Sequence, residues 1–340
     1  MDARHRDVLI AVIRDYIDSA EPVGSRVLAR RHFPHLSAAT LRNAMADLEE
    51  MGYLAQPHTS AGRVPTDKAY RLYVESFPPP QASPAPPQAP MPARRAGIEE
   101  FMERTSSQLS AATRLTGLLL APPLKQTTIA RIELMPLGND RALAVAVTDV
   151  GWLTVREVTL DPPLAADDTR AIGRELSRRF GGRTVEEILA MEAAPADPLD
   201  TLHTRWRPIT EEAVAMLSGR TLYISGATNM LDHPEFGDIA TTRELLRTFE
   251  RKERLTDLMT ELAADEGVRV TIGDENPVNE MRDCTLITST YLYRNQVLGI
   301  LGVVGPRRLP YPDVIAIVNE TARHVTDALS RVRQDLYLPS

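Results

Sequence analysis

The feature that most constrains the fold is a proline-rich stretch at residues 78–92, PPPQASPAPPQAPMP, in which eight of fifteen positions are proline. Proline has no N–H to donate and a fixed φ, so neither a helix nor a central strand can run through this stretch. We therefore predict a semi-extended linker over 78–97. It divides the chain into a small N-terminal module at 1–77 and a larger second part at 98–335.

Cysteine content and hydropathy exclude several classes of protein. Cys284 is the only cysteine in the sequence, which rules out a disulfide framework within the chain and a thiolate-clustered zinc site. The longest apolar run, 297–305, has nine residues, whereas a membrane-spanning helix needs about 18. The N-terminus starts with mixed charges and lacks a signal-peptide pattern. We expect a cytoplasmic protein with no membrane contact, no metal and no cofactor.

Charge is distributed unevenly between the two parts. The whole chain carries a net charge of −7. Residues 1–75 contain ten basic and ten acidic residues, together with four of the seven histidines, whereas the rest of the chain contains 29 basic and 36 acidic residues. Because all of the excess negative charge lies in the second part, a polyanionic partner is expected to bind the first module.

The N-terminal module has the pattern of three helices, a hairpin and a fourth helix. Apolar residues at helical spacing identify the helices, and turn-rich residues separate two short β-like runs. The predicted helices cover 4–19, 26–32 and the stretch between Ser37 and Gly52, and the β-like runs cover 53–56 and 63–65. This order of elements is the layout of a winged helix-turn-helix.

The third predicted helix presents side chains suited to reading DNA. Its apolar stripe consists of Leu41, Met45, Leu48 and Met51. Packing that stripe against the core turns Ala39, Arg42 and Asn43 outward, with Thr40 on the flank. Arginine can bind guanine or phosphate, asparagine can bind adenine, and alanine lets the backbone approach the groove. Ser37 caps the helix, whose N-terminus favours a neighbouring phosphate.

The tip of the predicted hairpin offers groups for contacts with the DNA backbone, namely small hydroxyls, a histidine and one cation. Together with the third helix, it makes the candidate DNA-binding residues Ser37, Ala39, Thr40, Arg42, Asn43, His58, Thr59, Ser60 and Arg63. Two other interpretations stay open at this point. The module could be a small helical bundle whose Arg42 and Asn43 face solvent, or a helix-turn-helix that docks another protein.

The second part alternates predicted helices and strands. An amphipathic helix is expected at 98–118, and three strand-like runs lie between 127 and 160. Residues 165–218 are mostly helical in pattern. The remaining elements are strands at 221–225, 268–272, 284–293 and 297–304 and helices at 241–264 and 312–333. Strands mixed with helices that cover one face of a sheet predict an α+β domain.

Several motifs resemble the HrcA family of heat-inducible transcription repressors. In the first module, the matching stretches are 21–25 (EPVGS), 37–43 (SAATLRN), 45–49 (MADLE), 52–54 (GYL), 56–68 (QPHTSAGRVPTDK) and 70–71 (YR). Near the other end, 302–306 (GVVGP) and Tyr311 resemble the C-terminal signature of the family. Ala44, Ala69 and 308–310 depart from the family pattern without removing a candidate DNA-binding residue.

The resemblance implies an α+β multidomain chain. Its parts are a winged helix-turn-helix at 1–77 and a GAF-like domain at 98–160 and 220–335, interrupted by an inserted, mainly helical dimerisation domain at 161–219. It also implies a homodimer that binds an inverted repeat, the CIRCE element, upstream of operons for DnaK- and GroE-type chaperones. In the family, repression is released on heat shock, and GroE chaperonin is the implied partner that keeps the repressor active.

Other functional classes have weaker support in the sequence. Gly299, Gly302 and Gly305 imitate a phosphate-binding loop but lack the Lys-Ser/Thr pair and the helix that follows such a loop. An enzyme is not expected, because the chain has no nucleophile elbow. A GAF-like fold suggests a small-molecule sensor, but we find no ligand fingerprint for one.

Overall fold

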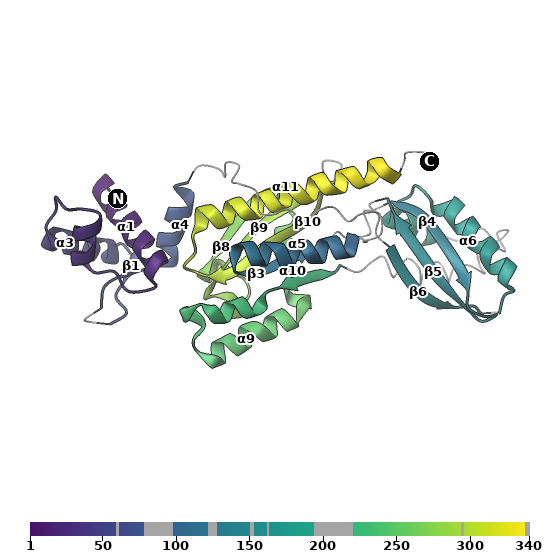
Figure 1. Ribbon diagram of the computed structural model, residues 1–340, viewed down its shortest axis with the longest axis horizontal. Helices are drawn as coiled ribbons and strands as arrows, with labels where there is room; N and C mark the ends of the chain where they lie inside the picture. Colours follow the sequence, from purple (N-terminus) through teal and green to yellow (C-terminus); the bar gives the residue numbers. More distant parts are fainter. Residues whose placement is uncertain are drawn as a thin grey trace.

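The computed structural model describes residues 1–58, 61–77, 98–121, 128–149, 153–161, 163–193, 220–293 and 296–336. Figure 1 shows three bodies in a row along the long axis of the molecule. The N-terminal module lies at one end, and a five-stranded sheet with its helices forms a central domain. A three-stranded sheet with helix α6 (Ala166–Phe180) forms an outer lobe at the other end.

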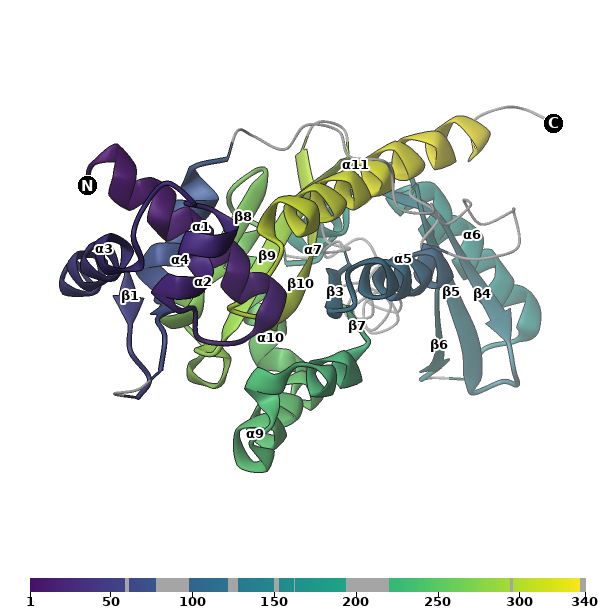
Figure 2. The ribbon, with the colours of Figure 1, turned by 60° about the vertical axis from the view of Figure 1, so that its left-hand side comes forward.

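The N-terminal module contains the elements that its sequence predicts. In chain order, these are α1 (Ala3–Ser19), α2 (Ser25–Arg31), α3 (Ala38–Glu50), β1 (Leu54–Ala55), β2 (Val64–Pro65) and α4 (Asp67–Glu75). Apolar residues from the helices, among them Val8, Leu28 and Leu48, are fully buried and form one core. The antiparallel hairpin of β1 and β2 projects from the module beside α3 (Figure 2).

The central domain is an antiparallel sheet with helices on both faces. Its strand order is β7 (Leu222–Ser225), β3 (Thr116–Leu120), β10 (Gln296–Pro306), β9 (Cys284–Tyr293) and β8 (Val268–Ile272). The helices, seen on either side of the sheet in Figure 1, are α5 (Ile98–Thr113) and α11 (Tyr311–Leu336) on one face and α9 (Ile239–Glu250) and α10 (Lys252–Leu262) on the other. The helix predicted at 241–264 is two helices, because Arg251 between them has a non-helical backbone.

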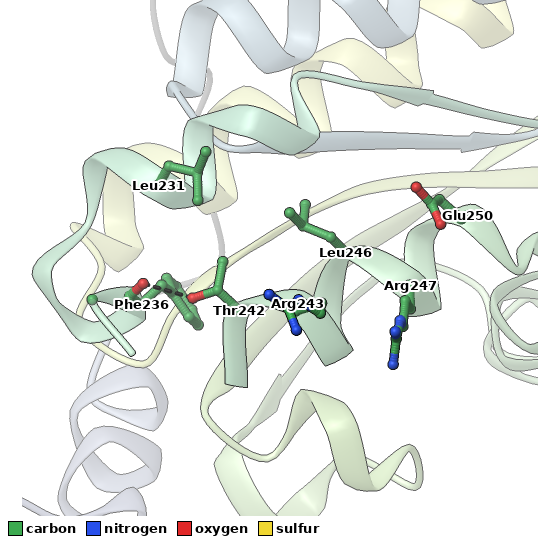
Figure 3. Close-up of a pocket in the computed structure, with 8 residues that line it drawn as sticks. Leu231, Phe236, Thr242, Arg243, Leu246, Arg247 and Glu250 are labelled. Carbon is green, nitrogen blue, oxygen red and sulfur yellow. Dashed lines mark hydrogen bonds between the residues drawn. The ribbon is translucent and has the colours of Figure 1, made fainter. Parts of the chain in front are cut away.

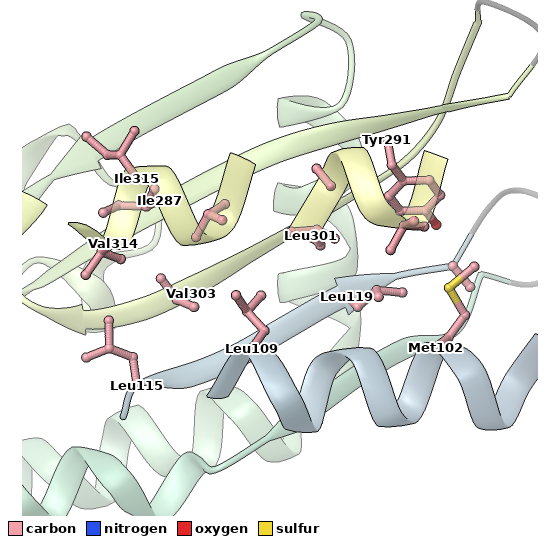
Figure 4. Packing of buried hydrophobic residues seen from close by; sticks show 14 of the residues in the cluster. Met102, Leu109, Leu115, Leu119, Ile287, Tyr291, Leu301, Val303, Val314 and Ile315 are labelled. Carbon is pink, nitrogen blue, oxygen red and sulfur yellow. The ribbon is translucent and has the colours of Figure 1, made fainter. Parts of the chain in front are cut away.

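Alternate residues of the central strands pack into two separate cores. Leu119, Leu301 and Val303 face α5 and α11 (Figure 4), whereas Leu120 belongs to the core that contains α9 and α10. Strand β10 is therefore buried along almost its whole length, which explains its continuous apolar sequence. The thiol of Cys284 on β9 is free and buried, and burial raises its pKa to about 12.

The outer lobe is built on its own antiparallel sheet. The strands β4 (Ile129–Pro136), β5 (Arg141–Thr148) and β6 (Leu153–Thr159) pair in chain order. Helix α6 packs closely on β4, since a Cβ at Gly173 would lie only 2.7 Å from the Leu134 nitrogen. The Ser177 hydroxyl on α6 accepts the Ile132 N–H and donates to the Ile132 carbonyl, each at 2.7 Å.

This arrangement differs from the domain limits expected from the sequence. The strands between 127 and 160 are expected in the first part of the GAF-like domain, but they pair with one another and pack against α6. The lobe therefore begins near residue 128 rather than at 161, and its described part also includes α7 (Val185–Ala193). Hydrophobic alternation identifies a strand without identifying its partner strands, so the sequence pattern cannot assign a strand to a sheet.

We predict that Leu301→Ala lowers the free energy of unfolding by about 2–5 kcal/mol, because it leaves a cavity between the sheet and the layer of α5 and α11. Denaturant unfolding followed by circular dichroism measures the change. Leu137→Ala is the matched control, since Leu137 is 50% exposed in the outer lobe, and it should cost less than about 0.5 kcal/mol. Equal losses for the two variants would contradict the packing described here.

Candidate nucleic-acid interface

The start of α3 is defined by a side-chain cap. The Ser37 hydroxyl accepts the Thr40 N–H at 3.0 Å and lies 2.8 Å from the Thr40 hydroxyl. The cap satisfies one of the N–H groups that the first turn leaves without a helical partner. A helix start carries partial positive charge, so this end of α3 favours a neighbouring phosphate.

The face of α3 that the sequence predicts to point outward is exposed. Ala39, Arg42 and Asn43 all lie at the surface, and neither Arg42 nor Asn43 forms a hydrogen bond or an ion pair with the described part of the chain. The buried face consists of Leu41, Ala44, Met45 and Leu48. Met51, predicted as part of the apolar stripe, is 38% exposed because it is the C-cap residue beyond the last turn.

The second half of α3 is acidic and engaged with the rest of the module. The Asp47 carboxylate lies 3.1 Å from Nε2 of His5 on α1. Hydrogen bonds with Asp47 and Asp2 raise the pKa of His5. Glu50 at the end of the helix is exposed. These carboxylates repel phosphate, so a nucleic-acid contact is confined to the first half of α3.

The candidate DNA-binding residues of the hairpin differ in their exposure. His58 is exposed, whereas Thr59 and Ser60 lie outside the described residues. Arg63 is engaged within the module: its Nη2 lies 2.8 Å from Glu49 Oε2, and its side chain is only 19% exposed. Arg63 therefore braces the hairpin against α3, and a phosphate has to compete with Glu49 for its guanidinium group.

Two arginines on α2 were missed by the sequence analysis. Arg26 and Arg30 are exposed, lie one turn apart, and have no hydrogen bond or ion pair within the described ranges. Arg31 next to them is engaged, because its Nη1 lies 3.4 Å from the buried carboxylate of Asp15. The Nε2 of His32 lies 2.9 Å from the same carboxylate. Because α2 packs on α3, Arg26 and Arg30 lie on the helix next to α3, and their guanidinium groups are not engaged by the described part of the chain. The signal for them was the arginine content of this short helix.

The central domain has an open pocket of about 590 Å³ between α9 and the 3-10 segments η2 (Ala227–Asp232) and η3 (Pro234–Phe236). Apolar side chains such as Leu231 and Leu246 line it together with Arg243 and Arg247 (Figure 3). The Thr242 hydroxyl in its wall donates to the Phe236 carbonyl at 2.6 Å. Glu250 at the end of α9 also lines the pocket, so the lining combines apolar side chains with charges of both signs.

Within the described residues, no group of three or more His, Cys, Asp or Glu side chains could hold a metal ion. In the same part of the chain, no helix combines the length and apolar character needed to cross a membrane.

A capped helix with an exposed polar face, a neighbouring hairpin and a separate α+β body are together the parts of a transcription regulator. A family model described as "HrcA protein C terminal domain" matches residues 99–315. The chain belongs to the HrcA family of heat-inducible transcription repressors. Members of the family are named as repressors and not as enzymes.

Relatives named "Heat-inducible transcription repressor HrcA" are similar to this chain over almost its full length. The relative from Symbiobacterium thermophilum is 36% identical and covers 96% of this chain and 98% of its own. The relative from Geobacter sulfurreducens is 39% identical and covers 96% of this chain and 97% of its own. A solved structure titled "Crystal structure of a hypothetical protein at 2.2 A resolution" has a TM-score of 0.69 at 23% identity and covers 98% of this chain and 99% of its own. The fold is therefore shared with that protein.

We predict that Asn43→Ala weakens binding to an inverted-repeat operator by about 1–3 kcal/mol and barely changes binding to a scrambled duplex, because a contact with an adenine edge is lost.

Arg42→Ala is expected to weaken binding to both duplexes and to lower the salt dependence of the affinity by about one unit of slope, since we favour a phosphate contact for Arg42. Arg63→Ala should also weaken both alike, because it removes a cation and the brace to α3. Titrations against both duplexes at two salt concentrations measure these effects.

The matched control for Asn43→Ala is Asn139→Ala, which removes an exposed asparagine in the outer lobe and should change neither affinity. Circular dichroism of each variant confirms that the fold is intact. Equal losses on both duplexes for Asn43→Ala would remove its base-reading role and make α3 a positioning element.

Proposed function

We propose that this chain is a homodimeric repressor that binds an inverted-repeat, CIRCE-type operator upstream of operons for DnaK- and GroE-type chaperones and leaves it on heat stress. The observation that carries the proposal is the exposed, unengaged pair of Arg42 and Asn43 on a capped helix. In this proposal the N-terminal module is a winged helix-turn-helix and the central domain is GAF-like. Membership of the family supports the choice of operator.

Helix α3 would enter the major groove with its first two turns. Asn43 then reaches an adenine edge, Arg42 reaches a phosphate, and the small Ala39 lets the helix come close to the bases. Arg26 and Arg30 on α2 contact the sugar-phosphate backbone, as the first helix of a helix-turn-helix crosses it. The acidic second half of α3 stays outside the groove.

The hairpin would lie along the backbone of the adjoining groove. His58, Thr59 and Ser60 are the proposed backbone contacts, and Ser37 and Thr40 at the start of α3 approach a phosphate on the other side. Arg63 contributes by holding the hairpin in place through Glu49 and by adding positive charge near the backbone.

The outer lobe supplies a surface for the homodimer. Helix α6 covers one face of its sheet, and on the other face Met135 and Val155 are about half exposed. The register places Leu143 opposite Met135 and Val145 opposite Val155, which makes a diagonal apolar strip across the three strands, flanked by Glu157 opposite Leu143 and Glu133 opposite Val145. Accessible apolar patches mark protein interaction sites. A two-fold contact through the strip relates two N-terminal modules as an inverted repeat requires.

We predict that the protein sediments as a dimer of two 37.6 kDa chains at micromolar concentration. Val155→Glu places a charge in the apolar strip, so it should give a monomer that binds a single half-site as the wild type does but loses the tighter binding to the full operator. Leu231→Glu is the matched control: Leu231 is 56% exposed in the central domain, and its replacement should leave the dimer intact. A wild-type chain that sediments only as a monomer, with and without operator, would contradict the homodimer.

The middle strand of the outer lobe, β5, buries less apolar area than the strands of the central sheet. The buried side chains of β5 are small, namely Ala142, Ala144, Ala146 and Thr148. Each removes less apolar surface from water than a leucine or isoleucine of the central sheet does, and the larger buried side chains of the lobe, such as Leu134 and Phe180, come from β4 and α6. We therefore propose that heat disrupts the second part first. Loss of the lobe separates the dimer while the DNA-reading module is still folded, and GroE-type chaperonin is the proposed partner that restores the active form.

We predict that, on heating the full chain, amide hydrogens of the outer lobe exchange at a lower temperature than those of the N-terminal helices, and that operator binding is lost at the lower temperature. Hydrogen exchange read by mass spectrometry, with operator binding measured in parallel, follows both events. If the N-terminal module loses protection first, the proposed order of events is wrong.

A further inference from the structure

Two stretches that are far apart in the sequence meet where the N-terminal module contacts the central domain. Asp67, the first residue of α4, accepts a hydrogen bond from Arg307 Nη1 at 3.2 Å and another from the Asp274 N–H at 3.1 Å. Arg307 follows the end of β10, and its Nη2 also donates to Asp283 at 2.9 Å. The contact needs a glycine at position 273, where a Cβ would collide with the Asp67 carboxylate.

A second arginine crosses the same boundary in the opposite direction. Arg71 on α4 donates through Nε to Glu275 Oε1 at 2.8 Å, and its Nη2 donates to the other carboxylate oxygen. The same Nη2 donates to the Val270 carbonyl on β8 at 2.6 Å. The guanidinium group is planar, so a bidentate pair combined with a backbone carbonyl determines the direction of approach as well as the distance.

A third arginine reaches another helix of the module. Arg308 Nη1 donates to the Ile17 carbonyl in the last turn of α1 at 2.6 Å, while its Nε donates to Glu235 at 2.6 Å. The central domain therefore holds the module at two separate helices, α1 and α4. Contacts at two separated points resist rotation of one body against the other, which a single contact cannot do.

Aromatic side chains fill the space between these polar contacts. The ring of Tyr311 at the start of α11 lies 5.8 Å from the ring of Tyr70 and 6.5 Å from that of Tyr73, centroid to centroid. All three are buried. The Tyr311 hydroxyl donates to the Arg307 carbonyl at 2.6 Å, so the aromatic contact and the arginine belong to one unit. A buried aromatic centre with a charged rim is the composition of a specific interface.

We propose that this junction, formed by Asp67, Tyr70, Arg71, Arg307, Arg308 and Tyr311, is the positioning device for DNA recognition. It fixes the distance and angle of α3 relative to the central domain. In a dimer, the two copies of α3 then stand at one set separation, and the protein selects operators by the spacing of their half-sites as well as by sequence. This inference rests on the proposed function, since it requires a dimer that binds an inverted repeat.

The test compares an inverted-repeat operator with a series in which base pairs are inserted at its centre, and with a single half-site. Wild-type protein should lose at least about tenfold in affinity when about five base pairs, half a helical turn, are inserted. The variant Arg71→Ala/Arg307→Ala should bind the unaltered operator about tenfold more weakly, vary less than about threefold across the series, and bind the half-site within about twofold of wild type. A role in folding alone would not flatten the dependence on spacing.

The matched control is Arg254→Ala/Arg269→Ala, which also removes two arginines but whose partners, Glu280 and Asp265, lie within the central domain. It should keep the wild-type dependence on spacing. The variant Arg71→Lys/Arg307→Lys keeps both charges without the planar fork, so an intermediate dependence is expected. Circular dichroism and sedimentation check that each variant is folded and dimeric.

Two outcomes would overturn the positioning role. The first is an unchanged dependence on spacing in the Arg71→Ala/Arg307→Ala and Arg71→Lys/Arg307→Lys variants. The second is an equal loss on half-site and operator, which makes the junction a support for the fold of the module only. Wild-type protein that binds neither duplex contradicts the proposed function itself, and the positioning role with it.

Discussion

Burial of both faces of β10 is the constraint on which the rest of the structure depends. The strand pairs with β3 and β9 and contributes Leu301 to one core and Val304 to the other. An apolar strand of this kind is stable only when helices cover both of its faces, so α5, α9, α10 and α11 all assemble around it. Its last residue, Pro306, leads directly to Arg307 and Arg308, so two of the arginines that hold the N-terminal module follow directly from this central strand.

The three bodies place different chemistry at different positions along the molecule. The N-terminal module presents exposed arginines and Asn43 at one end, and the outer lobe presents an apolar strip at the other (Figure 1). The central domain joins the two ends and buries large aliphatic side chains along its middle strands, whereas the middle strand of the lobe buries alanines. The surface proposed for dimerisation lies on the sheet that contains this strand, in the part of the chain that we propose heat disrupts first.

The candidate site was predictable from the sequence to the extent that helical periodicity decides exposure. Ala39, Arg42 and Asn43 follow from the position of the apolar stripe, and Ser37 follows from the preference for serine at an N-cap. The engagement of Arg63 by Glu49 was not predictable, because the two residues belong to different elements. A charged side chain in a turn-rich stretch has the same local pattern whether it is free or paired within the fold.

The sequence by itself determined the elements of the N-terminal module and the family, because these depend on local patterns and on contiguous motifs. Only the tertiary structure decided that the strands from 129 to 159 form their own sheet, and that Asp67 and Arg71 meet partners about two hundred residues away. The physical reason is that strand pairing and ion pairing join atoms that are distant along the chain. The partner in either kind of pair cannot be identified from the local sequence around one residue.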